Sequence, residues 1–349
     1  MTELLRDPAV LQVEPNQIFQ SEGEDFLPDL TKLWQFETQK VSAADLQIQD
    51  AWQISTGSKD VIVAVLDTGV DYRHPDLKEN MWTNEAELHG EAGVDDDENG
   101  FVDDIYGYDF FNEDGNPMDD GGHGTHCAGS IGANGRAGTG MVGVNRDVRI
   151  MAVKFLNARG FGTTENAIRA IDYAVSMGAR VLSNSWGGVS DESGLLKEAI
   201  ERAHRSGAIF VAAAGNIHND NDRMKYYPAS FQLPNVITVA SVNKDGNLAA
   251  TSNFGLRTVD LAAPGVDIYS TSLKKSYEVR SGTSMAAPFV SGVAALVLSV
   301  KPKISNFALK RCLLNSVTPL SGLTGLTKTG GTLNAFGALN DSCKKIASE

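Results

Sequence analysis

The sequence has few cysteines, more negative than positive charge and no uninterrupted apolar segment long enough to cross a membrane. Its 349 residues include 44 aspartates and glutamates against 30 lysines and arginines, a net charge of −14 at pH 7. This charge argues against nucleic acid and acidic membranes as partners. The longest apolar stretch, residues 286–300, contains Pro288, Ser291 and Gly292. A membrane span needs about 18 apolar residues, so none is expected.

The three cysteines fit a reducing compartment better than an exported protein, although so small a number decides little. Cys312 and Cys343 lie near the C-terminus and are a candidate pair, whose state the sequence leaves open. Residues 1–7 lack the basic and then apolar pattern of a signal peptide. Composition alone therefore leaves the compartment undecided.

Segments with strand and helix patterns alternate along the chain. Residues 163–177 carry apolar side chains at helical spacing and stop at Gly178, and residues 193–206 do the same and stop at Gly207. The alternation predicts an α/β fold in one domain, a mostly parallel sheet with helices on both faces. The expected strands are 60–67, 149–155, 180–185, 208–214, 236–242 and 259–262.

The segment Gly-Thr-Ser-Met-Ala-Ala-Pro at 282–288 places Ser284 at the start of an apolar helix predicted over 285–300. Amide groups in the first turn of a helix have no intrahelical partner and lie at the positive end of its dipole. A nucleophile attacking a carbonyl benefits there, because the developing oxyanion accepts hydrogen bonds from these amides. Taken alone, the segment fits a helix-capping role for Thr283 or Ser284 equally well.

Two other segments supply partners for a serine nucleophile. The apolar strand predicted up to Asp67 ends in Asp-Thr-Gly, and His123 opens a helix of small residues with His-Gly-Thr-His. The order Asp, His, Ser is that of the subtilisin triad and differs from the orders in chymotrypsin and the α/β-hydrolases. Asp67, His123 and Ser284 are therefore the candidate catalytic residues.

With these segments the chain resembles the subtilisin-like serine proteases over residues 52–340. The resemblance implies the three-layer subtilisin-like fold and a serine endopeptidase in which Ser284 attacks, His123 transfers the proton and Asp67 orients the imidazole. It assigns a structural role to the rival base His126. Residues 212–216 are similar to the strand end that carries the family's oxyanion-hole asparagine, which is Asn216 in this chain.

The resemblance also implies a peptide-binding cleft between two glycine-rich segments that pair with the substrate backbone. Ile217 follows Asn216 where relatives often carry a polar side chain, so the hypothesis is a preference for apolar or uncharged residues before the cut. Whether Tyr226 or Tyr227 shortens the pocket stays open. The segment residues are Gly160, Phe161, Gly162, Ser185, Trp186 and Gly187, and the pocket residues are Ala213, Ala214 and Gly215.

An acidic segment at 95–104 matches part of the EF-hand pattern, with oxygen-bearing side chains at alternate positions around Gly100. Tyr106 stands where an EF-hand has its bidentate glutamate, so a calcium loop is expected here and not an EF-hand; a solvated acidic turn is the alternative. The resemblance suggests two weaker metal sites, one at Asp76 with the loop at 134–141 and one at Asp260. The loop ligands expected for Ca²⁺ are Asp95, Asp97, Asn99, Phe101, Asp103 and Asp104.

Residues 1–25 resemble the C-terminal remnant of an inhibitor-like prodomain, which leaves 26–349 as the catalytic domain. Self-processing is expected between Asn16 and Asp29. The resemblance implies protein or peptide substrates, the chain's own prodomain as inhibitor, a monomer, and a secreted or cell-envelope location. An aspartic protease is a poor alternative because the chain has one Asp-Thr-Gly, and a non-enzymatic scaffold is disfavoured because the triad is complete.

Overall fold

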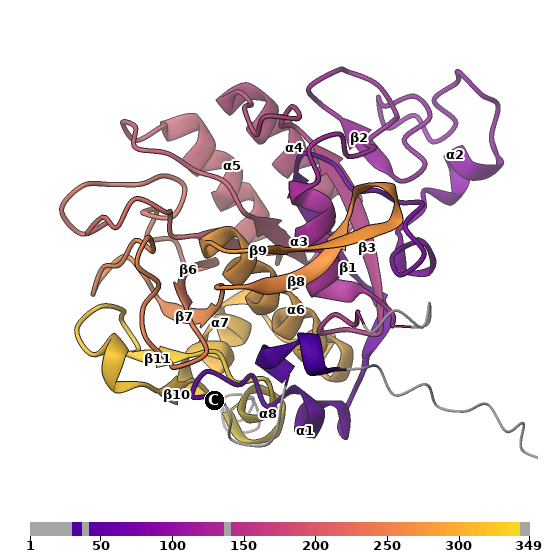
Figure 1. Cartoon of the computed structure of the whole chain (residues 1–349). Helices are drawn as coiled ribbons and strands as arrows, with labels where there is room; N and C mark the ends of the chain where they lie inside the picture. The colour runs from indigo at the N-terminus through magenta and orange to yellow at the C-terminus, as the bar shows by residue number, and fades with distance from the viewer. Residues whose placement is uncertain (1–29, 37–41, 136–140, 343–349) are drawn as a thin grey trace, which may run out of the picture.

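The computed structural model describes residues 30–36, 42–135 and 141–342. These residues form a nine-stranded sheet, a two-stranded hairpin and eight α-helices. Figure 1 shows the sheet running through the molecule with helices packed on it. The suggested prodomain remnant, 1–25, and Cys343 lie outside the described residues.

The large sheet is parallel except at one edge. Its order is β10-β11-β7-β6-β5-β4-β1-β3-β2, and among these strands β10 alone pairs antiparallel, with β11. A separate antiparallel hairpin joins β8 (Ile268–Ser272) to β9 (Ser276–Arg280). The sheet strands are β1 Gly57–Asp67, β2 Gly107–Asp109, β3 Asp147–Lys154, β4 Val181–Asn184, β5 Ile209–Ala213, β6 Val236–Val242, β7 Leu261–Pro264, β10 Thr318–Pro319 and β11 Gly331–Thr332.

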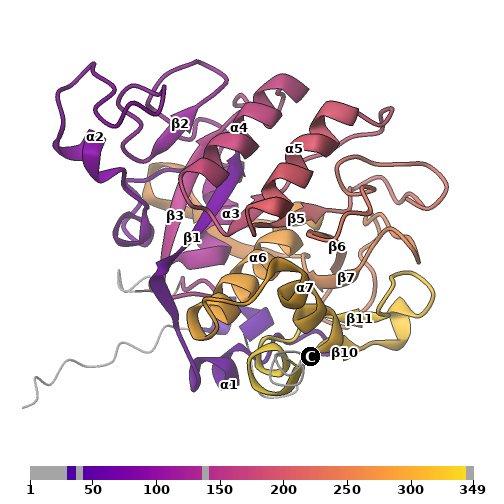
Figure 2. The ribbon, with the colours of Figure 1, turned by 180° about the vertical axis from the view of Figure 1, so that it is seen from behind.

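Strand β1 is apolar on both sides because it is covered on both sides. Val63 and Val65 belong to the core that includes α3 (His123–Gly132) and α6 (Thr283–Val300). Ala64 and Leu66 point the other way, into the core formed with α4 (Thr164–Ser176) and α5 (Gly194–Arg205). Figure 2 shows α4 and α5 side by side over their face of the sheet. The expected three-layer α/β architecture is confirmed. The remaining α-helices are α1 Ile48–Trp52, α2 Glu85–His89, α7 Asn306–Asn315 and α8 Ala335–Gly337.

Local capping determines where α4 and α5 begin and end. The Thr163 hydroxyl accepts a hydrogen bond from the Asn166 N–H, and the Ser193 hydroxyl accepts one from the Leu196 N–H. Both helices stop before a glycine with positive φ, Gly178 at 86° and Gly207 at 85°. The predicted boundaries were therefore correct to within a residue.

Helix α6 is long and apolar enough to span a membrane, with a mean hydropathy of 1.7 over Thr283–Val300, but 83% of this stretch is buried inside the protein. Within the described residues no other helix meets the same criteria. The burial of α6 fits a core helix, which was the expectation from its interrupted apolar sequence.

The order of the strands places a crevice at the end of β1. Strands β3 and β2 lie on one side of β1, whereas β4 lies on the other side and leads to β5 and β6. Open α/β sheets bind ligands at such a reversal, outside the carboxyl ends of the strands. Asp67 ends β1 and Ser185 directly follows β4.

Candidate active site

The Asp67 side chain is fully buried at the end of β1 and contacts the first residue of α3. Its Oδ1 lies 2.7 Å from His123 Nδ1 and also accepts a hydrogen bond from the Thr68 N–H. Burial opposes protonation of His123, but the charge and hydrogen bond of Asp67 outweigh it, so the pKa of His123 is raised. The structure thus brings the predicted acid and base together as a pair that stabilises imidazolium.

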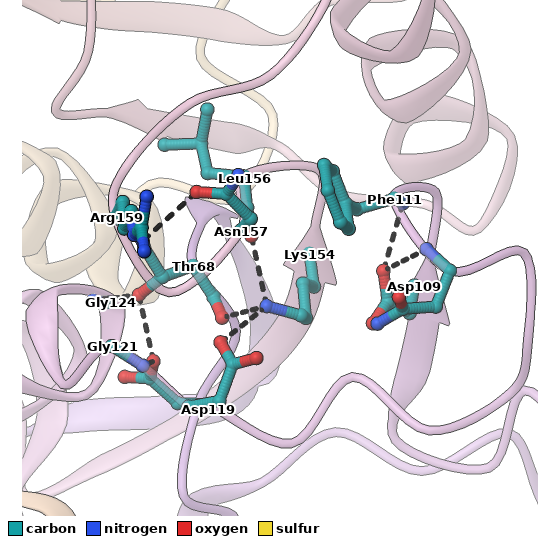
Figure 3. A network of polar contacts seen from close by, with 12 residues as sticks. Thr68, Asp109, Phe111, Asp119, Gly121, Gly124, Lys154, Leu156, Asn157 and Arg159 are labelled. Atoms are coloured by element: carbon teal, nitrogen blue, oxygen red, sulfur yellow. Dashed lines mark hydrogen bonds and ion pairs between the residues drawn. The ribbon is translucent and has the colours of Figure 1, made fainter.

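A buried carboxylate, Asp119, fixes this pair in place (Figure 3). Its Oδ1 accepts hydrogen bonds from the Thr68 hydroxyl at 2.8 Å and from the N–H groups of Gly121 and Gly122. Its Oδ2 accepts both the N–H and the hydroxyl of Thr125, in the first turn of α3. Asp119 therefore joins the turn after Asp67 to the helix that carries His123.

A buried cation, Lys154, lies beside this network at the end of β3 (Figure 3). Its ammonium donates to the carbonyls of Thr68 and Leu156, at 2.8 and 2.9 Å, and pairs with Asp120 at 2.8 Å. It links the catalytic turn to the chain that enters the glycine-rich segment at 160–162. Sequence reasoning missed both Lys154 and Asp119, because neither belongs to a recognisable local pattern.

Ser284 occupies the first turn of α6, as predicted. Pro288 lies four residues later and has no N–H, so it cannot bond the Ser284 carbonyl as a helix would require. The Ser185 hydroxyl donates to that carbonyl at 2.8 Å instead, and the Cys127 thiol contacts it at 3.5 Å. The Ser284 hydroxyl in turn donates to the Ser185 carbonyl at 3.1 Å.

In the described residues the Ser284 hydroxyl therefore bonds Ser185 and makes no hydrogen bond to His123. Catalytic hydrogen bonds are often long or misaligned without substrate and tighten in the reacting complex. Rotation of the Ser284 side chain about its Cα–Cβ bond is the change needed to turn the hydroxyl toward His123.

Asn216 is held in one orientation by Thr283. Its side-chain oxygen accepts the Thr283 N–H at 2.8 Å and the Thr283 hydroxyl at 3.1 Å. The Thr283 hydroxyl also accepts the Gly215 N–H. Because the side-chain oxygen already accepts these two bonds, the amide nitrogen of Asn216 is the atom left to bind a ligand. Thr283, which holds Asn216, directly precedes Ser284. This orientation suits a donor to an oxyanion.

His126 and Cys127 are buried in α3. His126 Nε2 bonds the Ile268 carbonyl at 3.0 Å, and burial lowers the pKa of His126 to about 4. A buried neutral ring bonded to β8 has a structural role, which agrees with the prediction. Burial also raises the pKa of the Cys127 thiol well above its usual value, which makes it a poor nucleophile.

Two adjoining cavities line the expected cleft. One, of about 340 Å³, includes His123, Ser185 and Gly187, and the other, of about 350 Å³, lies between Phe161 and Trp186. Phe161 is 70% exposed, whereas Trp186 packs on Phe155 with ring centroids 5.0 Å apart. The two glycine-rich segments thus face each other across a hollow that begins at His123.

Tyr226, and not Tyr227, borders the catalytic cavity. A side-chain carbon on Gly187 would lie 2.7 Å from the Tyr226 ring, and one on Gly215 would lie 2.9 Å from it. The Tyr226 hydroxyl donates to the Gly187 carbonyl at 3.0 Å. The ring therefore fills the space between the two glycines.

Comparisons with known proteins show the family of the chain. The family model Peptidase_S8, described as Subtilase family, matches residues 58–338. The chain belongs to the subtilase family. This subtilase is 36% identical over 300 residues to Subtilisin-like protease 1 of Plasmodium falciparum (isolate 3D7), an alignment covering 81% of the chain and 44% of that protein.

Two further comparisons cover more of the other protein. Thermitase from Thermoactinomyces vulgaris is 36% identical over 304 residues, which are 87% of this subtilase and 97% of thermitase. The crystal structure of a cold adapted subtilisin-like serine proteinase matches with a TM-score of 0.64 and 32% identity, covering 79% of this chain and 87% of that one. The chain thus spans less than half the length of the Plasmodium relative and nearly all of thermitase.

The acidic loop of this subtilase brings two of the predicted carboxylates, Asp95 and Asp97, together with one that was not predicted, Glu87. One oxygen each from Glu87, Asp95 and Asp97 lies within 4.8 Å of the others. Glu87, on α2, is 4% exposed and accepts the N–H groups of Asp96 and Asp103. Sequence reasoning missed Glu87 because it precedes the loop and belongs to a short helix.

The other predicted loop ligands lie around this cluster. The Asn99 amide donates to Asp97 and Asp104, both at 3.1 Å, and its oxygen accepts the Phe101 N–H. Burial raises the pKa of Asp104 to about 6, although it accepts a 2.6 Å bond from the Tyr173 hydroxyl. Asp103 is turned outward, and both its oxygens accept the Gly93 N–H.

The two weaker candidate metal sites differ from the loop. The Asp76 side chain is buried and accepts a hydrogen bond from the Tyr277 hydroxyl at 2.7 Å. Its backbone carbonyl accepts the Asn134 N–H. Residues 136–140 of the expected partner loop lie outside the described residues. Asp260 lies 3.3 Å from the Lys310 ammonium and 3.7 Å from that of Lys328. Two ammonium groups already balance Asp260, so this geometry does not favour a metal there.

Proposed function

We propose that this subtilase is a serine endopeptidase that uses Asp67, His123 and Ser284. The observation that carries the proposal is the buried Asp67–His123 contact of 2.7 Å at the crevice into which the first turn of α6 presents Ser284. The membership of the subtilase family and the relatives named as serine proteinase and thermitase support it.

In the proposed reaction, the Ser284 hydroxyl leaves its bond to Ser185 and attacks the peptide carbonyl while His123 takes its proton. The carbonyl carbon becomes tetrahedral, and its oxygen carries the negative charge. Collapse breaks the C–N bond, and His123 passes the proton to the leaving amine. Water then attacks the acyl-enzyme with His123 again as base, which releases the acid and restores Ser284.

The oxyanion is stabilised by the Asn216 amide and by N–H groups of the first turn of α6. Thr283 holds the Asn216 oxygen away from the reaction, so the amide needs no reorganisation when charge develops. Asp67 keeps Nδ1 of His123 protonated, which leaves Nε2 as the basic nitrogen.

The residue before the cut is apolar or uncharged and small. Tyr226 closes the space between Gly187 and Gly215, and the half-buried ring offers no charge to pair with a charged side chain. The pocket wall formed by Ala213 and Ala214 is likewise uncharged and buried. Backbone pairing with residues 160–162 and 185–187 supplies affinity that does not depend on side chains.

A calcium ion held by the acidic loop stabilises the fold. Glu87, Asp95 and Asp97 would supply carboxylate oxygens. Asn99, Phe101, Asp103 and Asp104 are further candidates in the loop, and Asp76 belongs to a separate, weaker candidate site. Three carboxylates within 4.8 Å of one another repel unless a cation lies among them, and carboxylate oxygen is the ligand type that Ca²⁺ prefers. The ion supplies structure only, and no catalytic step involves it.

We further propose an exported monomer whose prodomain inhibits it, with residues 1–25 as a prodomain remnant. Cys312 is disulfide-bonded, and disulfides persist mainly in oxidising compartments. Comparison of the N-termini of wild-type protein and Ser284→Ala protein tests self-processing, because identical N-termini would contradict it.

Covalent labelling tests the proposed function directly. A fluorophosphonate should react with one residue, Ser284, since its hydroxyl lies within the triad and beside the oxyanion donors. Peptide mapping by mass spectrometry should place the adduct there, and Ser284→Ala and His123→Ala proteins should not be labelled. Pepstatin sensitivity together with resistance to the fluorophosphonate would contradict the proposal.

A further inference from the structure

The charged groups at the catalytic cavity are unlike those of the chain as a whole. The chain carries 44 acidic against 30 basic residues. The residues lining the cavity beside His123 nevertheless include two arginines, Arg159 and Arg280, and no carboxylate. Donors of positive charge in the lining of a cleft attract negatively charged ligands.

Three further carboxylates close to this cavity are engaged in contacts within the protein. Asp119 accepts hydrogen bonds within the protein, and Asp120 pairs with the buried Lys154. Glu278 pairs with Arg280 through one oxygen, which bonds Nε and Nη2 of the arginine at 2.8 Å each. None of these three acids lines the cavity, so the charged side chains that a ligand meets in its lining are the two arginines.

Arg159 is free to bind a ligand from the upstream side. It is exposed, and within the described residues its guanidinium has no ion pair or side-chain hydrogen bond; the Asn157 oxygen accepts only its backbone N–H. Arg159 directly precedes Gly160, in the segment proposed to bind residues before the cut. Its guanidinium therefore lies where a substrate side chain upstream of the cut would pass.

Arg280 lies on the side of His123. It ends β9, four residues before Ser284, and its Nη2 would lie 3.2 Å from a side-chain carbon on Gly122, the residue before His123. The side chain is 28% exposed, and Nη1 makes no hydrogen bond within the described part of the chain. Because His123 returns the proton to the leaving amine, Arg280 faces the downstream part of the substrate.

We propose that this subtilase selects acidic segments, in which a carboxylate side chain before the cut binds Arg159 and one directly after the cut binds Arg280. The residue whose carbonyl is attacked stays uncharged, because Tyr226 lines its pocket. The inference rests on the proposed endopeptidase function and adds the substrate class. Guanidinium and carboxylate groups form paired, charge-assisted hydrogen bonds, which give this recognition its geometry.

Four internally quenched peptides that share one cleaved bond test the proposal. They carry Asn or Asp at the second position before the cut and at the first position after it. Wild-type enzyme should cleave the singly acidic peptides with a kcat/KM about 10-fold above the neutral parent, as expected for one hydrogen-bonded charge pair. This gain should shrink as salt is raised, because exposed charges are screened.

Arginine variants assign each gain to its residue. Arg280→Gln should abolish the gain from Asp after the cut and keep the gain from Asp before it, and Arg159→Gln should do the reverse. Arg205→Gln, an exposed arginine at the end of α5, is the matched control and should keep both gains. The ratio of kcat/KM for the Asp peptide to kcat/KM for the Asn peptide, measured in one preparation, does not depend on how much of the enzyme is folded. Arg159 is exposed, so it can be replaced without disturbing the core.

Equal cleavage of acidic and neutral peptides by wild-type enzyme would overturn the inference while leaving the endopeptidase function intact. The inference would also be overturned if the ratio of kcat/KM for acidic to neutral peptides were the same in Arg159→Gln and Arg280→Gln proteins as in wild type. Failure to cleave any of the four peptides, together with absent labelling of Ser284, would overturn the proposed function and this inference with it.

Discussion

The site around Asp67, His123 and Asp119 (the catalytic corner) and the acidic loop both gather carboxylates, but they balance the charge in opposite ways. At the corner, Asp119 is buried and accepts hydrogen bonds from two hydroxyls and three N–H groups of its own chain. In the loop, Glu87, Asp95 and Asp97 face one another. The corner is complete when the chain folds, whereas we propose that the loop is complete only with a cation.

The comparison explains which part of the molecule each region serves. A site that stabilises a developing charge must be rigid before the substrate arrives, and donors supplied by the chain provide that. A loop outside the sheet needs only a fixed conformation. A bound ion can supply it, but the stability gained then depends on the concentration of free ion. Changes at the corner should therefore affect turnover, and changes at the loop should affect stability.

The largest effect is expected when a donor at the corner is removed. Asn216→Ala should lower kcat by about 10²–10³-fold with little change in KM, since the lost hydrogen bond forms only with the oxyanion. The subtilisin asparagine is the known case behind this figure. Steady-state kinetics would measure it, with Asn166→Ala on α4 as control. An unchanged kcat would remove Asn216 from the mechanism.

A pH titration separates the two histidines of α3. The pKa of His126 is lowered to about 4 by burial, so the unfolded chain binds a proton more tightly. Stability should therefore be complete above the ordinary pKa of histidine and should fall as pH drops toward 4, by roughly 3 kcal/mol. Urea melts at several pH values would measure the loss. His126→Gln should flatten this slope, and an equal slope in both proteins would contradict the assignment.

His123 has the opposite shift, which Asp67 causes against the effect of burial. Its protonation should therefore lower kcat/KM on the acid side at a pH above that expected for an isolated histidine.

Removal of calcium is the test of the loop. Chelation should lower the melting temperature and speed self-digestion, and added calcium should restore both; binding at 100 times Kd contributes about 2.7 kcal/mol. Thermal melts of Asp97→Asn protein should respond less to chelator, whereas Asp245→Asn, in an exposed turn, should respond like wild type. Melting curves indifferent to both chelator and calcium would show an acidic turn only.

The smallest of these effects is expected for Asp119→Asn. The amide nitrogen that replaces one oxygen cannot accept the Thr125 donors, which should cost about 2 kcal/mol of stability and lower kcat through the misplaced His123. The exposed neighbour Asp120, changed in the same way, should cost less. Denaturant melts and kinetics on both variants would measure this, and equal losses would show that burial of Asp119 does not matter.

The sequence alone was enough wherever a local pattern determines structure. Thr163, Ser193, Gly178 and Gly207 specify helix ends through contacts within a few residues, and the helix limits were correct. The apolar runs located the central strands, although β7 begins two residues later than predicted. Strands β2, β10 and β11 are two or three residues long, and β9 is largely exposed, so their sequences carry no clear period.

The site divides in the same way. Asp67, His123, Asn216 and Ser284 stand in short, specific segments and could be proposed from them. Asp119, Lys154 and Glu87 act through contacts with residues from other segments, and only the folded chain brings those contacts together. The orientation of Arg159 and Arg280 toward one cavity likewise required the structure.

Pro288 makes helix stability and catalysis compete at one position. A proline inside a helix costs about 3 kcal/mol relative to alanine, so Pro288→Ala would be an obvious stabilising substitution. The new N–H would bond the Ser284 carbonyl, which now accepts the Ser185 hydroxyl and so ties the nucleophile to the substrate-binding segment. A Pro288→Ala substitution made for stability would therefore weaken the Ser185–Ser284 contact. The hydrogen bond that is missing from the helix is what leaves the carbonyl of Ser284, the second residue of α6, able to bind Ser185.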